Sequence, residues 1–419
     1  MNICLNASSK KIIIMLDELN NLDLNIIENN CLNPLYIKFI EEYKNIEIDK
    51  LNKNTKHIKI INQLPNILAF LKERGELESI NYEDPELKKL INKHITNQTF
   101  PKEIMKNLID ENLYSEYSSY DILLSIEKIN KLTTIKLDKL NLSIYHRTIL
   151  KQSDIDVILK RCLILSRVHN INDPINIKIW LTNTKKKIDK NYLILGSREI
   201  NSGLTTMSLI HRETTILRKE EYKKLIIHEL IHYLELDFKI KLGCSFHKNF
   251  NISPTIDITL YESYTEISAC IINVILSSYE CQNKENYPLF KQFITYETKF
   301  CLFQIAKILL FFGFKDITDF VKPYDGKYRF NQTTHVFSYF FVKGALLYNI
   351  DKTVEFYNSH CNIIKFNRNK FGYDKYIKLI MVCCLDKKFL NQINKIMSII
   401  KTNNTMKKFN SMRMTCIEI

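Results

Sequence analysis

Apolar residues recur at a spacing of three or four positions along most of this chain, which is typical of amphipathic helices. In the first part of the chain, this spacing predicts helices at Ile12–Leu22, Pro34–Tyr43, Ile61–Arg74 and Asp84–His94. Polar breaks separate these four segments, and none of them carries residues at a spacing associated with chemistry. We therefore predict that residues 1–130 form an accessory helical domain.

Strict alternation of apolar and polar residues replaces the helical spacing after this part. It predicts strands at Leu140–Tyr145 and Ile175–Trp180, with a helix over Ile155–Val168 between them. Shorter extended segments are expected at Tyr192–Leu195, Glu199–Ser208 and Thr214–Leu217. A small sheet is therefore expected near the middle of the chain.

Long helical patterns return after the predicted strands. They predict helices at Glu220–Asp237, Ile258–Ser278, Tyr287–Phe312, Thr333–Tyr348 and Asp374–Lys401. The whole pattern predicts an α+β fold that is mostly helical. We assign residues 131–401 to a second domain and residues 402–419 to a frayed basic tail.

The composition narrows the class of protein. The chain has 419 residues, of which 45% are hydrophobic and 25% charged, as in ordinary globular proteins. No apolar run approaches the roughly 18 residues that cross a bilayer, and no signal peptide begins the sequence. The 11 cysteines have no CxxC spacing, so we expect reduced thiols. These features predict a soluble intracellular protein that is not secreted and has no membrane span.

The chain is basic, with 60 Lys and Arg against 46 Asp and Glu and a net charge of +14. Such a charge would suit nucleic acid or another acidic partner. The lysines are scattered singly, however, and the densest clusters, Lys185–Lys187 and Lys407–Lys408, are short. We therefore favour a solvated basic surface over a nucleic-acid site. The oligomeric state is not readable from the sequence.

A His-Glu-x-x-His motif lies in the helix predicted over Glu220–Asp237, at His228, Glu229 and His232. Two histidines four positions apart project from one face of a helix and can bind one zinc ion. Glu229 would then be the general base that deprotonates the zinc-activated water. The rest of this helix is mostly apolar, so these polar side chains would be costly to bury without a metal. The sequence therefore predicts a Zn²⁺ site.

A zinc site of this kind needs a third protein ligand, and acidic candidates follow the motif. Glu262 and Glu266 are one helical turn apart, so one can bind zinc while the other accepts the ring N–H of a ligating histidine. We favour Glu262 as the ligand and Glu266 as the partner of a histidine. Asp237 is the alternative, either as the ligand or as a second such partner. As a ligand it would require the helix to stop and turn back, although no Gly lies between His232 and Asp237.

This arrangement of His228, Glu229, His232, Glu262 and Glu266 resembles the gluzincin branch of zinc metallopeptidases. In that branch, HExxH on one helix is followed by Glu-x-x-x-Glu on a later helix. The resemblance implies a zincin-like catalytic domain, in which a small mixed sheet accompanies the HExxH helix and the helix of the third ligand.

A second resemblance covers roughly Trp180 to Leu347. It is to an uncharacterised family of large nucleocytoplasmic DNA viruses, which includes giant-virus, iridovirus-like and poxvirus-like members. The matching stretches are Ile200–Thr205, Ile216–Glu221, His228–Phe238, Tyr261–Asn273 and Val336–Tyr339. That family usually has Gly at the position of Glu235. The resemblance implies a viral protein, which we expect in the host cytoplasm or the virion.

Peptide hydrolysis builds negative charge on the carbonyl oxygen, and a hydrogen-bond donor must stabilise it. In gluzincins, a Tyr or His of a later helix has this role. His335 and Tyr339 are four positions apart in the helix predicted over Thr333–Tyr348, and we expect one of them to be the donor. Tyr261 and Tyr264 are weaker alternatives.

A zincin sheet also offers an edge strand that pairs with an extended substrate. Asn201–Thr205 precedes the metal helix by one predicted strand, which is the expected place for such an edge. Asn201 and Gly203 are therefore candidates for binding the substrate. An ordinary hairpin turn at Ser202 and Gly203 is the alternative.

Three functions remain open from the sequence. The first is a zinc-dependent peptidase that acts on a polypeptide substrate, with Glu229 as general base and then as proton donor to the leaving amine. The second is a non-enzymatic, zinc-stabilised viral structural or host-interaction protein. The third is another zinc hydrolase, such as a carboxypeptidase, which a closed pocket lined by Lys or Arg would indicate.

Overall fold

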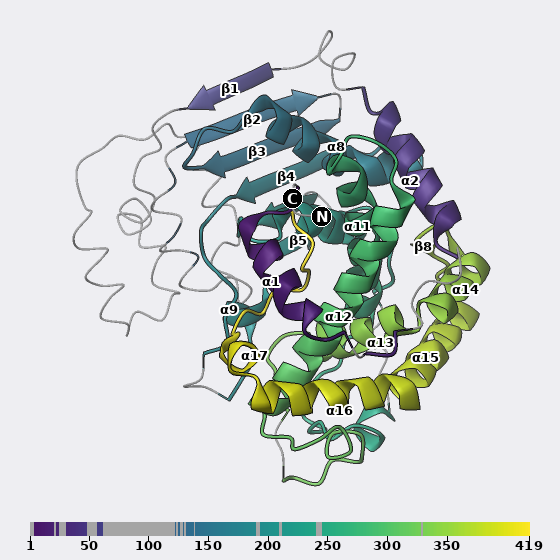
Figure 1. Ribbon diagram of the computed structural model, residues 1–419. Coiled ribbons are helices and arrows are strands. Elements are labelled where there is room, and N and C mark those ends of the chain that lie inside the picture. Colours follow the sequence, from purple (N-terminus) through teal and green to yellow (C-terminus); the bar gives the residue numbers. More distant parts are fainter. Residues whose placement is uncertain are drawn as a thin grey trace, which may run out of the picture.

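The computed structural model of the protein describes most of the chain outside the first third. The described residues are 4–20, 22–24, 31–47, 57–61, 122, 125, 129, 131–137, 139–189, 193–208, 212–239, 245–327 and 330–419. These residues form an α+β fold in which helices predominate around a mixed sheet (Figure 1).

Six strands form this sheet in the order β1-β2-β3-β4-β6-β5. Their bounds are β1 (His57–Ile61), β2 (Lys131–Leu137), β3 (Leu140–His146), β4 (Ile175–Trp180), β5 (Gly203–Met207) and β6 (Arg212–Ile216). Strands β3, β4 and β6 run parallel to one another, whereas β5 pairs with β6 in the antiparallel direction. Strand β5 is the last in the order and therefore forms one edge of the described sheet.

The helices lie beside and below the sheet in the view of Figure 1. Their bounds are α1 (Ala7–Asp17), α2 (Asn33–Asn45), α8 (Gln152–Val168), α9 (Ser197–Ile200), α10 (Tyr222–Tyr233), α11 (Tyr261–Glu280), α12 (Tyr287–Phe311), α13 (Lys343–Tyr348), α14 (Ile350–His360), α15 (Lys370–Cys384), α16 (Lys387–Thr402) and α17 (Asn404–Lys408). A 3₁₀ turn spans Ser245–Lys248, a π-helical segment spans Phe337–Val342, and a small hairpin joins β7 (Cys361–Asn362) to β8 (Lys365–Phe366).

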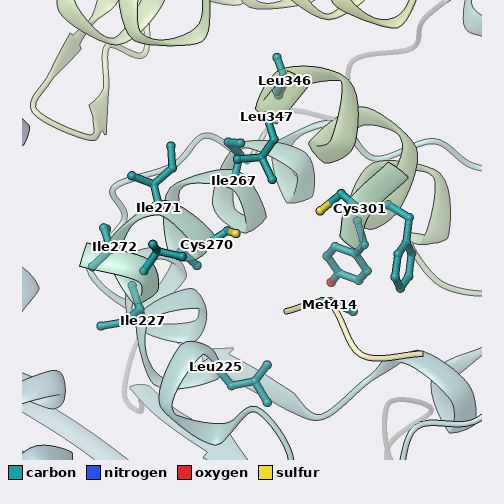
Figure 2. Packing of buried hydrophobic residues seen from close by; sticks show 14 of the residues in the cluster. Leu225, Ile227, Ile267, Cys270, Ile271, Ile272, Cys301, Leu346, Leu347 and Met414 are labelled. Carbon is teal, nitrogen blue, oxygen red and sulfur yellow. The ribbon is translucent and has the colours of Figure 1, made fainter. Parts of the chain in front are cut away.

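Helix α10 connects the sheet to the helical layers. It contacts β5 and β6 and also packs on α8 and α11. Helix α11 packs in turn on α12, and almost all of its side chains are buried, as expected for a helix that is apolar around most of its circumference. Side chains of α10, α11, α12 and α13 meet in one apolar cluster (Figure 2). Helix α10 is therefore packed between the sheet and the helices α8 and α11.

Most elements predicted after residue 131 are confirmed. The predicted strands at Leu140–Tyr145 and Ile175–Trp180 correspond to β3 and β4, and the long helices correspond to α8, α10, α11 and α12. The prediction of a strand at Tyr192–Leu195 was wrong where the structure describes it, since Leu195 forms only an isolated bridge to Gln332. Strand β2 and helix α14 had not been predicted.

The helix predicted over Asp374–Lys401 is two helices, α15 and α16. Asp386 separates them, because its side chain accepts a hydrogen bond from the backbone N–H of Phe389 and so starts a new helix. No helix among the described residues is long and apolar enough to cross a bilayer.

The first 130 residues are described only in part. Helices α1 and α2 are present, and they pack on α12, α11 and α8. Ile61 ends β1, and the remainder of the helices predicted at Ile61–Arg74 and Asp84–His94 lies outside the described residues. The division of the chain near residue 130 therefore stays a prediction.

The expectation of a frayed tail after Thr402 was wrong. Helix α17 follows α16, and residues 412–417 of the segment 409–419 are then buried in the interior of the molecule. Met414 lies among Leu225 and Cys301 of the helical core (Figure 2). The backbone N–H groups of this segment find acidic partners, because Glu221 accepts from Met414 and Thr415.

Glu297 of α12 continues this pairing, since its Oε1 accepts from the backbone N–H groups of Cys416 and Ile417 at 3.0 and 2.9 Å. The segment also reaches the start of the chain, because the backbone N–H of Asn6 donates to the carbonyl oxygen of Glu418 at 2.9 Å. The beginning and the end of the described chain thus lie side by side (Figure 1).

Cys4 and Cys281 form a disulfide, so the expectation of reduced thiols was wrong for this pair. The two cysteines are separated by 277 residues, and no local spacing could have indicated that they meet. The bond ties the beginning of the described chain to the C-terminal end of α11. Eight further cysteines of the described chain are free thiols.

Candidate metal centre

Helix α10 carries the HExxH motif and has an unusual residue at each end. Glu221 precedes the helix with φ +65°, and Glu235 follows it with φ +53°. At the C-terminal end, the N–H of Leu236 donates to the carbonyl of Ile231 at 2.9 Å and that of Glu235 to His232 at 3.0 Å. This is the Schellman pattern, which normally has Gly in the left-handed position. The helix therefore stops and turns back without a glycine.

The two histidines and Glu262 converge on one point. Oε2 of Glu262 lies 3.5 Å from Nε2 of His228 and 3.4 Å from Nε2 of His232. All three candidate ligand atoms lie within 4.8 Å of one another. In the described part of the chain, no other group of three such residues is arranged in this way. The spacing of the sequence motif thus becomes a three-sided site in space.

The second ring nitrogen of each histidine, Nδ1, forms a hydrogen bond with a carboxylate. Nδ1 of His228 lies 2.9 Å from Oε2 of Glu266, and Nδ1 of His232 lies 2.6 Å from Oδ2 of Asp237. Such partners fix the ring and leave Nε2 facing the centre. Asp237 reaches His232 because of the turn at Glu235, so its place is behind the histidine, and Glu262 lies among the candidate ligand atoms.

The histidines and carboxylates of this cluster shift one another's pKa values in the direction that favours their charged forms. Burial alone would raise the pKa of Glu262, but His232 and His228 outweigh it and hold this pKa well below its usual value. Burial likewise lowers the pKa of His232, whereas Glu262 and Asp237 raise it well above its usual value. The carboxylate is therefore ionised, as a metal ligand must be.

Glu229 lies on the side of the centre that faces the edge strand. The hydroxyl of Thr205 donates to Oε2 of Glu229 at 2.8 Å, and Oγ1 of Thr205 is 3.0 Å from Oγ1 of Thr214 on β6. A Cβ added to Gly203 would lie 2.8 Å from Oε1 of Glu229 and 3.2 Å from the carbonyl of Thr215. Gly203 therefore allows the strand and the carboxylate to approach closely.

Tyr339 and His335 both reach Glu262 of the same centre. The hydroxyl of Tyr339 donates to Oε2 of Glu262 at 2.9 Å, whereas Nε2 of His335 lies 4.0 Å from Oε1 of Glu262. Tyr339 lies in the π-helical segment Phe337–Val342, and such segments are frequent at functional sites. Burial, reinforced by Glu262 and Glu229, raises the pKa of Tyr339 well above its usual value, so its hydroxyl keeps a proton to donate.

The two weaker tyrosine candidates have different surroundings. Tyr264 donates to the carbonyl of Ile364, away from the centre, and takes part in the aromatic core around Phe238. Tyr261 lines the cavity and lies with its ring centroid 6.1 Å from that of His232.

A cavity of about 420 Å³ opens over the centre. Residues 200–207 of the edge segment line this cavity, and so do His335 and Tyr339. Asn201 is one of the residues that line the cavity, and its side-chain oxygen accepts a hydrogen bond from the hydroxyl of Thr334 at 2.9 Å. Its neighbour Ser202 is buried and its hydroxyl lacks a hydrogen-bond partner among the described residues. The alternative of a hairpin turn at Ser202 and Gly203 was wrong, because Gly203 begins strand β5.

The donor set fits a zinc ion. A tetrahedral zinc with bonds of about 2.0–2.1 Å places its ligand atoms roughly 3.3 Å apart. The distances of 3.5 and 3.4 Å from Glu262 to the two Nε2 atoms are close to this spacing. Two imidazoles and one carboxylate would leave a fourth corner open toward the cavity, as in catalytic rather than structural zinc sites.

Several residues at the site were not predicted from the sequence. Thr205 contacts Glu229, and Lys224 and Lys343 contact Glu266. Met414 contacts both of these lysines. Only Lys224 had a local signal, because it lies four positions before His228 on the same helix face. The other three come from distant segments.

Comparison with known proteins gives a narrow result. The chain is similar to an uncharacterised protein of Acanthamoeba polyphaga mimivirus, with 26% identity over 192 residues. The match covers 43% of this chain and 46% of that protein, so the chain spans about half the length of its relative. No protein-family model matches the chain, and no solved structure matches it. The chain therefore has a distant relative in a giant virus.

Proposed function

We propose that the protein is a zinc-dependent peptidase of the gluzincin type with a zincin-like catalytic domain. The observation that carries this proposal is the convergence of His228, His232 and Glu262 on a cavity that an edge strand borders and that Glu229, an acid outside this group of three, also lines. A structural zinc site would have a fourth protein ligand and no need of Glu229. The similarity to a mimivirus protein supports a viral origin, with the host cytoplasm or the virion as its place of action.

Each residue at the centre would have a separate role in the proposed reaction. A polypeptide substrate would lie along β5 as an additional strand and place its scissile carbonyl over the centre. Bound Zn²⁺ would supply a Lewis acid for that carbonyl and for the attacking water. Glu229 would take the proton of the water and pass it to the leaving amine. The hydroxyl of Tyr339 or the ring of His335 would donate to the oxygen on which negative charge develops.

Substitution of Glu229 by Gln tests this proposal. The purified full chain should contain about one zinc per molecule, and the wild type should cleave members of a quenched fluorescent peptide library. Glu229→Gln should keep the metal and lose cleavage by at least about 100-fold, because the amide cannot accept the proton. Glu285→Gln, an exposed acid paired with Lys44, is the matched control and should behave as wild type. A folded wild type that takes up no zinc would reject the proposal.

A further inference from the structure

Behind the candidate metal centre lies a buried group of charges that the proposed reaction does not use. The carboxylate of Glu266 is contacted by two lysines that come from different elements. Nζ of Lys224 lies 2.6 Å from Oε1 and 2.5 Å from Oε2, and Nζ of Lys343 lies 3.2 Å from Oε1. All three side chains are almost completely buried. We call Lys224, Lys343 and Glu266 the lysine brace.

The brace joins four segments of the chain. Lys224 is in the first turn of α10, Glu266 in the middle of α11, and Lys343 at the start of α13, directly after the π-helical segment. Nζ of Lys343 also donates to the carbonyl of Met414 at 2.5 Å, and Nζ of Lys224 lies 3.7 Å from its sulfur. The brace therefore fixes the position of α11 relative to α10, which carries two of the candidate ligands.

Such an arrangement is expensive for stability alone. Burying an ion pair costs desolvation energy that the attraction between the charges often only balances, and apolar residues of similar size would serve the fold as well. Here two ammonium groups hold one carboxylate. The cost is explained if the lysines serve to position Oε2 of Glu266, the oxygen that forms a hydrogen bond with Nδ1 of His228.

The hydrogen-bonding capacities of these groups decide the state of His228. A lysine ammonium has only donors, so both oxygens of Glu266 act as acceptors toward the lysines. Oε2 of Glu266 then accepts from Nδ1 of His228 as well, at 2.9 Å. A histidine that carries its hydrogen on Nδ1 leaves the lone pair of Nε2 toward Glu262 and His232. This is the tautomer that can bind a cation.

The second histidine is held by a different device. Oδ2 of Asp237 accepts from His232 and, at 3.2 Å, from the hydroxyl of Thr265. Arg368 donates to the backbone carbonyl of Asp237, not to its carboxylate. The lysine brace therefore contacts the partner of His228, Glu266, and not the partner of His232, Asp237.

We propose that Lys224 and Lys343 are positioning residues of the metal centre, which hold Glu266 so that it presents His228 with Nε2 free for the cation. This inference rests on the proposed zinc site, but not on the identity of the substrate. It makes zinc affinity depend on two lysines that never touch the metal.

Zinc affinity measured by competition with a chromophoric chelator tests the brace. Lys343→Met and Lys224→Met should each weaken zinc binding by about 10- to 100-fold, the usual effect of removing a group that orients a ligand. The visible spectrum of the cobalt-substituted protein should also change, because His228 would leave the coordination sphere. Lys307→Met is the matched control, since Lys307 is a buried lysine that donates to Ser411 of the same C-terminal segment but does not contact Glu266.

The outcomes separate the two proposals. Absence of zinc binding in the folded wild type rejects the peptidase proposal itself. If the wild type binds zinc and both folded lysine variants match it within twofold, or if Lys307→Met weakens binding equally, the brace is rejected.

One measurement does not depend on the folding of any lysine variant. The NMR spectrum of the ¹⁵N-histidine-labelled full chain reports the tautomer of His228, assigned by the signal that is missing in His228→Asn. At a pH where the ring of His228 carries a single hydrogen, its position on Nδ1 in the zinc-free wild type supports the proposal, and its position on Nε2 overturns it.

Discussion

Thr205 links the candidate general base to the strand that would hold the substrate. Its hydroxyl donates to Oε2 of Glu229, and its backbone belongs to β5. A substrate paired with β5 would therefore be placed by the same segment that orients the base. At the scale of single residues, this shared support is what would keep the attacking water and the scissile bond in register.

Replacement of Thr205 by Val should remove this support with little change in shape. We expect kcat to fall by about 10- to 100-fold, because small displacements of a reacting group cost rate factors of this order. Zinc content should be unchanged, and Thr205→Ser should restore most of the activity. Steady-state kinetics together with metal analysis will decide. Equal activity of the Val and wild-type proteins would show that Glu229 needs no such partner.

Glu235 ends helix α10 at a cost in conformational energy. Its φ of +53° is in the left-handed region, where a residue with a Cβ is disfavoured by roughly 1 kcal/mol relative to Gly. Its carboxylate contacts Arg212 and Arg368, but at partly exposed positions where ion pairs contribute little. The need to turn Asp237 back toward His232 explains why the strain persists.

Glu235→Gly should therefore stabilise the protein by about 0.5–1 kcal/mol. The increase is to be measured as the free energy of unfolding in urea, with zinc affinity unchanged. Glu235→Ala removes the same carboxylate but keeps the Cβ, so it should not be stabilising. An equal gain from both substitutions would place the effect in the lost ion pairs.

Helices α8 and α11 are joined by a buried ion pair. Nε of Arg161 lies 2.8 Å from Oε1 of Glu280, which also accepts from the hydroxyl of Tyr43 on α2. Burial alone would raise the pKa of Glu280, but Arg161 outweighs it and lowers the pKa. The folded state thus binds a proton less readily than the unfolded one, and the stability contributed by Glu280 is present above its unfolded pKa and lost as the pH falls through its folded pKa.

Glu280→Gln should destabilise the protein by about 3 kcal/mol, because Arg161 is left buried without a charged partner. Urea unfolding at pH 7 will measure this loss, and the difference from wild type should shrink as the pH is lowered into the acid range. The exposed Glu285→Gln control should change the free energy of unfolding by less than about 1 kcal/mol. A comparable loss in both variants would contradict the assignment.

The sequence predicted the elements that depend on local pattern. The apolar periodicity of α11 and α12 and the alternation of β4 are properties of neighbouring residues, so their places were found within a few positions. Around the candidate site, the motif spacing and Glu262 were enough to predict which side chains would meet. Glu235 was missed as a turn residue because a left-handed conformation is seldom expected without Gly or Asn.

What the sequence did not reveal depends on distant partners. Residues 409–419 follow a stretch of lysine and polar residues, and they show no periodic spacing of apolar positions. Their burial is decided by Glu221 and Glu297, which accept their backbone N–H groups from far away in the sequence. Lys343 likewise gains its role only when α13 is brought beside α11. Such long-range pairings leave no local signature.

The Cys4–Cys281 disulfide constrains the molecule as a whole, since it closes a loop of 277 residues. A crosslink over so long a loop restricts the unfolded chain and stabilises the native state by about 2–4 kcal/mol in typical cases. Cys281→Ser should therefore lower the midpoint of thermal unfolding, and a reductant should lower the wild type to the same value. Cys383→Ser, which removes a free buried thiol, is the control for loss of a sulfur atom alone. Insensitivity of the wild type to reductant would show that the bond contributes nothing.

The burial of residues 412–417 has a consequence for how the protein folds during translation. Until the ribosome has synthesised that stretch, Glu221 at the start of α10 and Lys343 of the brace lack the backbone partners that residues 414 and 415 supply. A growing polypeptide would thus carry its HExxH sequence for almost two hundred codons before the centre could mature. Any hydrolytic activity should accordingly arise only after residues 414 and 415 have been synthesised and have packed against Glu221 and Lys343.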